Sequence, residues 1–139
     1  MITRDDLKKY QDLLIMIDSL DVEITETYNT YKSPAIISDG GGHASDPGNP
    51  TARAMHRIER LKAERARIQN QIEEIETFVS NIKDPRERTI CNLHYLTGYT
   101  WSATCWRMRK HYSATMLIDY DRRWWQEHSR ETETETENT

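Results

Sequence analysis

Two segments of this chain repeat apolar residues at alternating steps of three and four, the spacing of one helix face. Residues 33–50 separate them and contain three successive glycines and three prolines, which cannot continue a helix. We therefore expect two helices folded back as a long antiparallel, coiled-coil-like hairpin over residues 1–83. The apolar positions are Leu7, Tyr10, Leu14, Ile17, Ile24, Tyr28 and Tyr31, then Ile58, Leu61, Ile68, Ile72, Ile75, Val79 and Ile82.

One charged residue interrupts each apolar face. These residues are Asp21 in the first segment and Arg65 in the second. The simplest closure of the loop sets Leu14 against Ile72 and, in the same register, Asp21 against Arg65. The two interruptions then form a structural ion pair, which fixes register at some cost in stability. The alternative is that each charged side chain reaches water separately at the edge of the apolar face.

The first helix also carries apolar residues outside its main face, namely Leu13, Met16 and Leu20. One partner helix does not cover this much apolar surface, so the pattern favours a homodimer or a higher homo-oligomer. The alternative is that this second stripe packs on the C-terminal part of the chain or on Ile36 and Ile37 of the loop.

Residues 84–127, called the head below, read as three short helices. Asp84 suits the amino end of the first helix, and Gly98 suits its carboxyl end. Thr100 and Ser113 are typical caps for the two helices that follow. The expected fold class is therefore all-α, a helical hairpin followed by a three-helix head with helix-turn-helix spacing. Within residues 128–139, Glu and Thr alternate from 131 to 137 at low complexity, which predicts a disordered acidic tail over 128–139.

Four motifs stand out in the head, namely Arg86 and Arg88, then Tyr95-Leu96-Thr97-Gly98, Thr100-Trp101 and Ser113-Ala114-Thr115-Met116. With these motifs the head resembles region 4 of bacterial sigma factors. Further motifs of the chain are Tyr31-Lys32-Ser33-Pro34, Asp46-Pro47, Pro50-Thr51-Ala52-Arg53-Ala54 and Ile82-Lys83-Asp84. With them, and outside the Thr-Glu tail, the chain resembles small late-gene transcriptional activators of phages and prophages of Gram-positive bacteria, the RinA-like and ArpU-like proteins.

The resemblance implies binding of double-stranded DNA at a phage promoter in the host cytoplasm, with RNA polymerase as a further partner. The amino end of the helix after Ser113 would enter the major groove, with Leu117 or Ile118 against thymine methyls and basic side chains on phosphates. The expected DNA-contacting residues are Arg86, Arg88, Thr100, Trp101, Arg107, Arg109, Lys110, Ser113, Thr115, Leu117 and Arg122.

Charge agrees with this expectation only in part. The whole chain has a formal net charge of -4, yet residues 84–125 hold seven basic and four acidic side chains, a net charge of +3. Against binding, Asp119 and Asp121 lie on the helix expected to read bases, where carboxylates repel phosphates. A non-regulatory alternative is a phage assembly or adaptor protein, such as a DNA recogniser similar to a terminase small subunit.

Other chemistry is less well supported by the sequence. Cys91, His94, Cys105 and His111 fit no common zinc-finger spacing, so we expect no metal or other cofactor and two buried, reduced thiols. The chain has no nucleophile-base constellation and no phosphate-binding loop, which argues against an enzyme. It also lacks an apolar run of the roughly 18 residues that span a bilayer, so we expect a cytoplasmic protein without a membrane partner.

Overall fold

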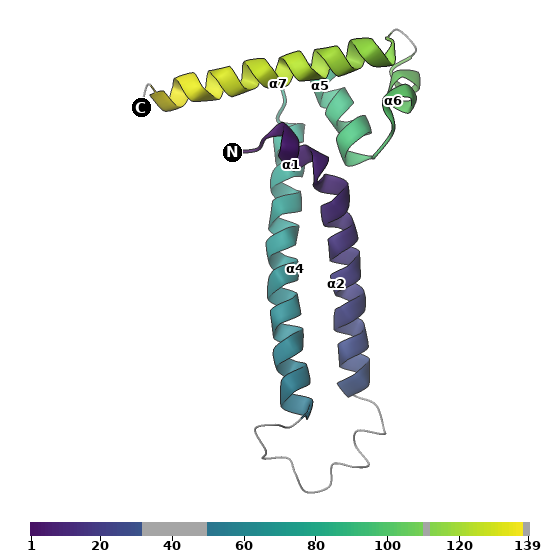
Figure 1. The fold of residues 1–139 in the computed structure, drawn as a ribbon, viewed down its shortest axis with the longest axis vertical. Helices are drawn as coiled ribbons and strands as arrows, with labels where there is room; N and C mark the ends of the chain where they lie inside the picture. Colours follow the sequence, from purple (N-terminus) through teal and green to yellow (C-terminus); the bar gives the residue numbers. More distant parts are fainter. Residues whose placement is uncertain (32–49, 110–111, 138–139) are drawn as a thin grey trace, which may run out of the picture. The chain divides into compact units, whose positions relative to one another are not determined.

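A computed structural model describes residues 1–31, 50–109 and 112–137 (Figure 1). These residues are mostly helical and form no strand, which confirms the all-α prediction. No helix in these ranges is both long and apolar enough to cross a membrane. The expected loop contacts of Ile36 and Ile37, and the expected roles of Lys110 and His111, lie outside the described residues. The helices are α1 (Arg4–Lys8), α2 (Tyr10–Tyr31), α4 (Pro50–Ser80), α5 (Pro85–Ile90), the π-helix η1 (Cys91–Leu96), α6 (Trp101–Arg107) and α7 (Ala114–Glu137).

The chain divides into two compact units, and the division differs from the expected boundary at residue 83. One unit is residues 12–72, and the other joins residues 1–11 to residues 73–139. The amino-terminal residues belong with the head because Gln11 donates from Nε2 to the carbonyls of Tyr95, at 3.2 Å, and Leu96, at 2.5 Å. A prediction that followed chain order alone could not foresee this grouping.

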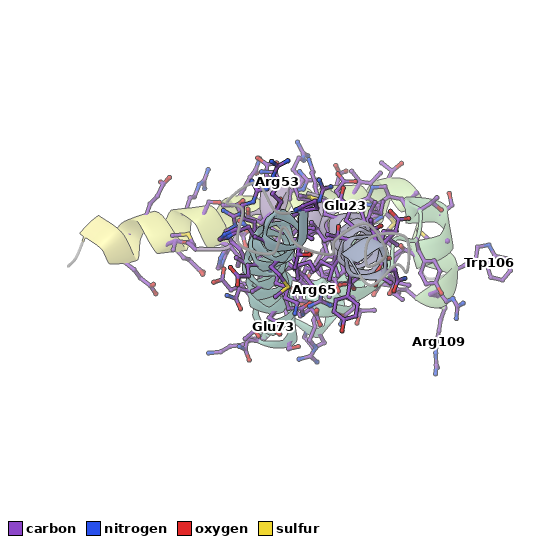
Figure 2. The ribbon with its side chains drawn as sticks, turned by 90° about the horizontal axis from the view of Figure 1, so that it is seen from below. Glu23, Arg53, Arg65, Glu73, Trp106 and Arg109 are labelled. Atoms are coloured by element: carbon purple, nitrogen blue, oxygen red, sulfur yellow. The ribbon has the colours of Figure 1, made fainter. Side chains whose placement is uncertain are left out.

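Within residues 12–72, α2 and α4 lie side by side, as the lengthwise and end-on views agree (Figures 1 and 2). Ile17, Ile58, Ile68 and Ile72 are buried, as their apolar spacing predicts. Leu20 is also buried, although the sequence placed it on a second, outward stripe. Met16 of that stripe is exposed as expected, and so are Ile15 and Val22. Tyr28 is exposed as well, although its spacing placed it on the main apolar face.

The ion pair expected between Asp21 and Arg65 is present. Arg65 Nε lies 2.5 Å from Asp21 Oδ1, and Arg65 Nη2 lies 3.3 Å from Oδ2. The two side chains remain 47% and 38% exposed, respectively. The pair therefore lies at the edge of the apolar face, where water screens it, and not inside a dry seam.

The head begins and ends its helices with the expected local chemistry. Asp84 accepts from the amide of Arg86, Thr100 Oγ1 accepts from the amide of Ala103 at 3.1 Å, and Ser113 Oγ accepts from the amide of Met116 at 3.1 Å. Gly98 follows η1 with a φ of +88°, and a Cβ there would lie 3.3 Å from the Gln11 amide group. Its backbone angle favours glycine, and a Cβ would also press on the end of the Gln11 side chain.

Ile90, Cys105 and Leu117 form the apolar core of the head. Trp101, Met108, Tyr112, Ala114 and Tyr120 pack around these three residues. Cys91 and Cys105 are free and buried, which agrees with the expectation of reduced thiols. The head is therefore held by one small core contributed by α5, α6 and α7.

The tail differs from the prediction of disorder, because α7 continues through Glu137. Extending an existing helix needs no new nucleus, and glutamate is a good helix former. Thr134 Oγ1 donates to the carbonyl of Arg130 at 2.9 Å, a bond typical of threonine inside a helix. Composition alone did not reveal that a packed helix precedes the Thr-Glu repeat.

Candidate nucleic-acid interface

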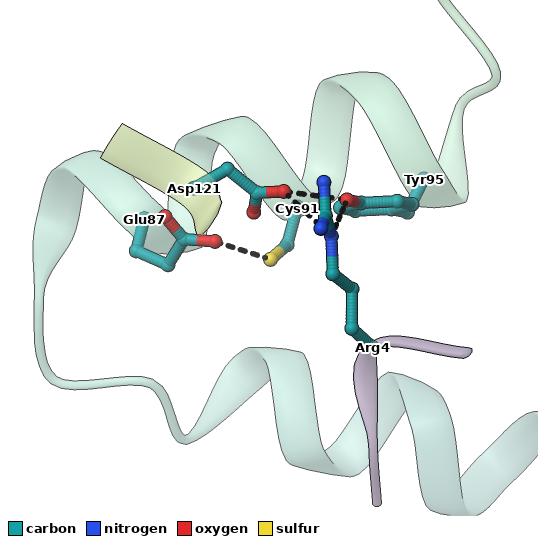
Figure 3. A network of polar contacts seen from close by, with 5 residues as sticks. All are labelled: Arg4, Glu87, Cys91, Tyr95 and Asp121. Carbon is teal, nitrogen blue, oxygen red and sulfur yellow. Dashed lines mark hydrogen bonds and ion pairs between the residues drawn. The ribbon is translucent and has the colours of Figure 1, made fainter. Parts of the chain in front are cut away.

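A cluster of polar side chains is buried beneath the expected DNA-reading helix (Figure 3). This buried polar cluster consists of Glu87, Cys91, Tyr95, Asp121 and Arg4 of the amino-terminal segment. Tyr95 Oη donates to Asp121 Oδ2 at 2.6 Å, and Arg4 Nε lies 3.3 Å from the same oxygen. Cys91 Sγ donates to Glu87 Oε1 at 3.3 Å. The cluster joins α1, α5, η1 and α7 through polar contacts.

Two carboxyl groups in one dry site do not both ionise easily. Burial, followed by a hydrogen bond to Asp121 and the charge of Asp121, raises the pKa of Glu87 to about 10. Burial also raises the pKa of the Cys91 thiol, with Glu87 adding to the effect. At neutral pH Glu87 is thus an uncharged acid and Cys91 a thiol, while Asp121 forms an ion pair with Arg4.

Asp121 and Leu117 do not face solvent, which corrects two expectations. Both side chains are fully buried, Leu117 in the apolar core and Asp121 in the buried polar cluster. They lie four residues apart on the inward face of α7, with Trp125 one turn further on. Leu117 therefore cannot contact thymine methyls, and Asp121 does not repel phosphates. The sequence could not tell which face of this helix turns inward.

The outward face of α7 carries Thr115, Ile118 and Arg122, and the exposed Ser113 precedes its first residue; Ile118 is 36% exposed. Of the two residues considered for contact with thymine methyls, Ile118 is therefore the one on the outward face. Arg122 Nη2 lies 3.2 Å from Asp119 Oδ1, so one arginine partly balances the single acidic group on this part of the face. The arrangement leaves a small mixed surface of hydroxyl, methyl and guanidinium groups.

The expected phosphate-binding arginines are all exposed. The Arg86 guanidinium lies 4.9 Å from the centre of the Tyr112 ring and 4.8 Å from that of Tyr120. Arg107 lies 5.1 Å from the Tyr99 ring centre and donates from Nη2 to Tyr99 Oη at 3.1 Å. Stacking on rings holds a guanidinium in place while its edge stays available to an anion.

Arg88 and Arg109 differ in how the backbone presents them. Arg88 Nη1 donates to the carbonyl of Ile82 at 3.3 Å, which draws its side chain toward the end of α4. Arg109 follows α6 with a φ of 64°, the left-handed conformation in which it points away from the ribbon (Figure 2). Arg109 is therefore better placed than Arg88 to meet a partner.

Of the residues considered as a zinc set, Cys91, His94 and Cys105 lie in the described part of the chain, and these three do not converge. His94 stacks on Trp101 with ring centres 3.8 Å apart, and its Nδ1 lies 2.8 Å from the carbonyl of Tyr99. Cys91 faces Glu87, and Cys105 is in the apolar core. Trp101, expected on DNA, is half-buried by this packing, whereas Thr100 remains exposed.

Sequence reasoning missed the buried polar cluster. A detectable signal was the spacing of Glu87 and Cys91, four residues apart and therefore on one face of a helix. The contributions of Arg4 and Asp121 carried no local signal. No protein-family model, curated protein or solved structure matches this chain.

Proposed function

We propose that this protein binds double-stranded DNA through α6 and the amino end of α7, and acts as a transcriptional regulator at a phage promoter. The observation that carries the proposal is the position of the acidic groups of the head. Glu87 is buried and neutral and Asp121 is buried beside Arg4, whereas Arg86, Arg107, Arg109 and Arg122 remain exposed. The surface is thus more basic than the sequence charge of +3 over residues 84–125 indicates.

The proposed contacts fall into two groups with different roles. Arg107 and Arg109, together with Lys110 on sequence grounds, contact phosphates and set the position of the protein without reading sequence. Thr115, Ile118 and Arg122 lie on the outward face of α7 and contact base edges in the major groove. Ser113 caps that helix and presents its amino end to the DNA backbone.

The test is retention of genomic fragments by the purified full-length protein, followed by titration of a retained fragment at several salt concentrations. We expect affinity to fall steeply with salt, since phosphate binding releases counterions. Arg109→Ala lowers affinity for all fragments and reduces the salt slope by about one. Ile118→Ala weakens binding to the retained fragment more than binding to random DNA. Arg57→Ala in α4, an exposed arginine outside the head, is the matched control and leaves binding unchanged.

We propose in addition that copies of the chain associate through α2 and place two heads on one DNA site. Ile15, Met16 and Val22 support this because 65%, 43% and 55% of their surfaces are exposed, respectively. Light scattering of the full chain distinguishes the outcomes: a dimer agrees with a promoter regulator, whereas a ring of many copies favours the adaptor alternative. Contact with RNA polymerase is a further proposal, which the resemblance to sigma region 4 supports.

A further inference from the structure

We propose that Glu87, Cys91 and Asp121 bind one Zn²⁺ ion inside the head. One donor atom from each residue lies within 4.8 Å of the other two, and all three side chains are fully buried. Glu87 and Cys91 are one helical turn apart on continuous helix, and Asp121 approaches from α7 (Figure 3). Zinc is commonly held by two ligands four residues apart on one helix, with a third ligand from another element.

A separate observation also points to a ligand. Asp121 Oδ1 and Glu87 Oε2 are buried acceptors without a donor from any other residue that the structure describes, so without a cation they must share the proton of Glu87. Asp121 turns its other oxygen to Tyr95 and Arg4, while Oδ1 faces Glu87 and Cys91 (Figure 3). A buried carboxylate oxygen without a donor is costly, so it calls for a proton or a cation.

The spacing of the donors suits zinc. In a tetrahedral site with Zn–S of about 2.3 Å and Zn–O of about 2.0 Å, sulfur and oxygen lie about 3.5 Å apart. The Cys91 Sγ and Glu87 Oε1 atoms are 3.3 Å apart, which is close to that sulfur–oxygen distance. A thiolate ligand favours zinc over Mg²⁺ and Ca²⁺, which prefer oxygen donors. Asp121 offers the third donor, within 4.8 Å of the other two.

Asp121 is also held as metal ligands usually are. Ligands are commonly oriented by hydrogen bonds from residues behind them. Here Tyr95 Oη donates to Asp121 Oδ2 at 2.6 Å, and Arg4 Nε lies 3.3 Å from that oxygen and 3.1 Å from Tyr95 Oη. These contacts leave Oδ1 for the ion.

The exchange of two protons for one Zn²⁺ ion balances in charge. Zinc binding breaks the S–H bond of Cys91 and the O–H bond of Glu87, releases both protons to water, and forms Zn–S and Zn–O bonds. Two protons leave and one dication enters, so the net charge of the buried polar cluster does not change. The Asp121–Arg4 ion pair is retained throughout.

The experiment uses the full chain, freed of metal with a chelator and kept reduced. Zn²⁺ titrated against a chromophoric chelator should show one tight site per chain. Co²⁺ should give a thiolate-to-metal charge-transfer band. Cys91→Ala should weaken Zn²⁺ binding about 100-fold or more and remove the cobalt band, whereas the matched thiol control Cys105→Ala should keep both.

Absence of zinc binding by the folded wild type would overturn the proposal, and so would equal affinity in Cys91→Ala. Either result would mean that Glu87 and Asp121 share a proton and do not bind a metal ion. If Cys91→Ala does not fold, the cobalt spectrum of the wild type and of Cys105→Ala decides. A thiolate band in both proteins supports the site, and its absence from the wild type contradicts it.

Discussion

The Arg4 guanidinium forms an ion pair with Asp121, with Arg4 Nε 3.3 Å from Asp121 Oδ2. Arg4 lies in the short helix α1 near the amino terminus, and Asp121 lies in α7. The Asp121 side chain is fully buried, whereas 30% of the Arg4 side chain is exposed. The first residues of the chain thus neutralise a charge beneath the helix proposed to contact DNA.

Arg4→Ala should destabilise the protein by about 2–3 kcal/mol, because it leaves the Asp121 carboxylate buried without its cation. The partial exposure of Arg4 keeps the expected loss at the low end for a buried pair. Urea unfolding measures the change, with Lys8→Ala, an exposed cation of the same helix, as the control. Equal stability of the two variants would show that Asp121 does not depend on Arg4.

Glu87→Gln should reduce the loss of folding stability that the wild type shows as pH rises. The folded pKa of Glu87, about 10, lies above the ordinary value of 4.5, so the folded state keeps a proton that the unfolded chain releases. This stabilisation is complete below pH 4.5 and is lost as pH rises toward about 10, by at most about 1.4 kcal/mol per pH unit.

Chemical unfolding between about pH 6 and pH 9, with a chelator present, measures this effect. The Gln variant stays neutral, so its stability should change less over this window than that of the wild type. Glu59→Gln, at an exposed position of α4, is the control and should follow the wild type. Parallel curves for Glu87→Gln and the wild type would mean that Glu87 is ionised in the folded protein.

Leu117→Ala and Ile118→Ala should separate packing from DNA contact. Leu117 is fully buried in the core, so its truncation should cost about 2–5 kcal/mol of stability. Ile118 is 36% exposed, so its truncation should cost less than about 1 kcal/mol while it weakens DNA binding. Thermal unfolding and DNA titration of both variants measure the contrast. A large stability loss in Ile118→Ala would place that side chain in the core instead.

The coupling free energy between Asp21 and Arg65 should be small and should decrease as salt is added. Their ion pair is partly exposed, so salt screens it. A double-mutant cycle with Asp21→Asn and Arg65→Gln should give a favourable coupling at about 50 mM NaCl and none at about 1 M. Coupling that persists at high salt would indicate that the pair is shielded from water, for example by a second copy of the chain.

Much of the local structure followed from short-range patterns. The caps Thr100 and Ser113, the helix end at Gly98 and the Asp21–Arg65 register depend on residue type and spacing. Each of these features is set by neighbours within a turn of helix or by one repeating apolar face. Such information is present in the sequence itself.

The candidate site required tertiary structure for a different reason. An amphipathic helix has more than one face that can turn inward, so α7 could have displayed Leu117 and Asp121 or buried them. Long-range partners made that choice, since Asp121 is stable inside only when Arg4 and Tyr95 reach it. The sequence therefore determined which segments are helices and where they are capped. Only the tertiary structure decided which charges of the head are buried and which remain available to a partner.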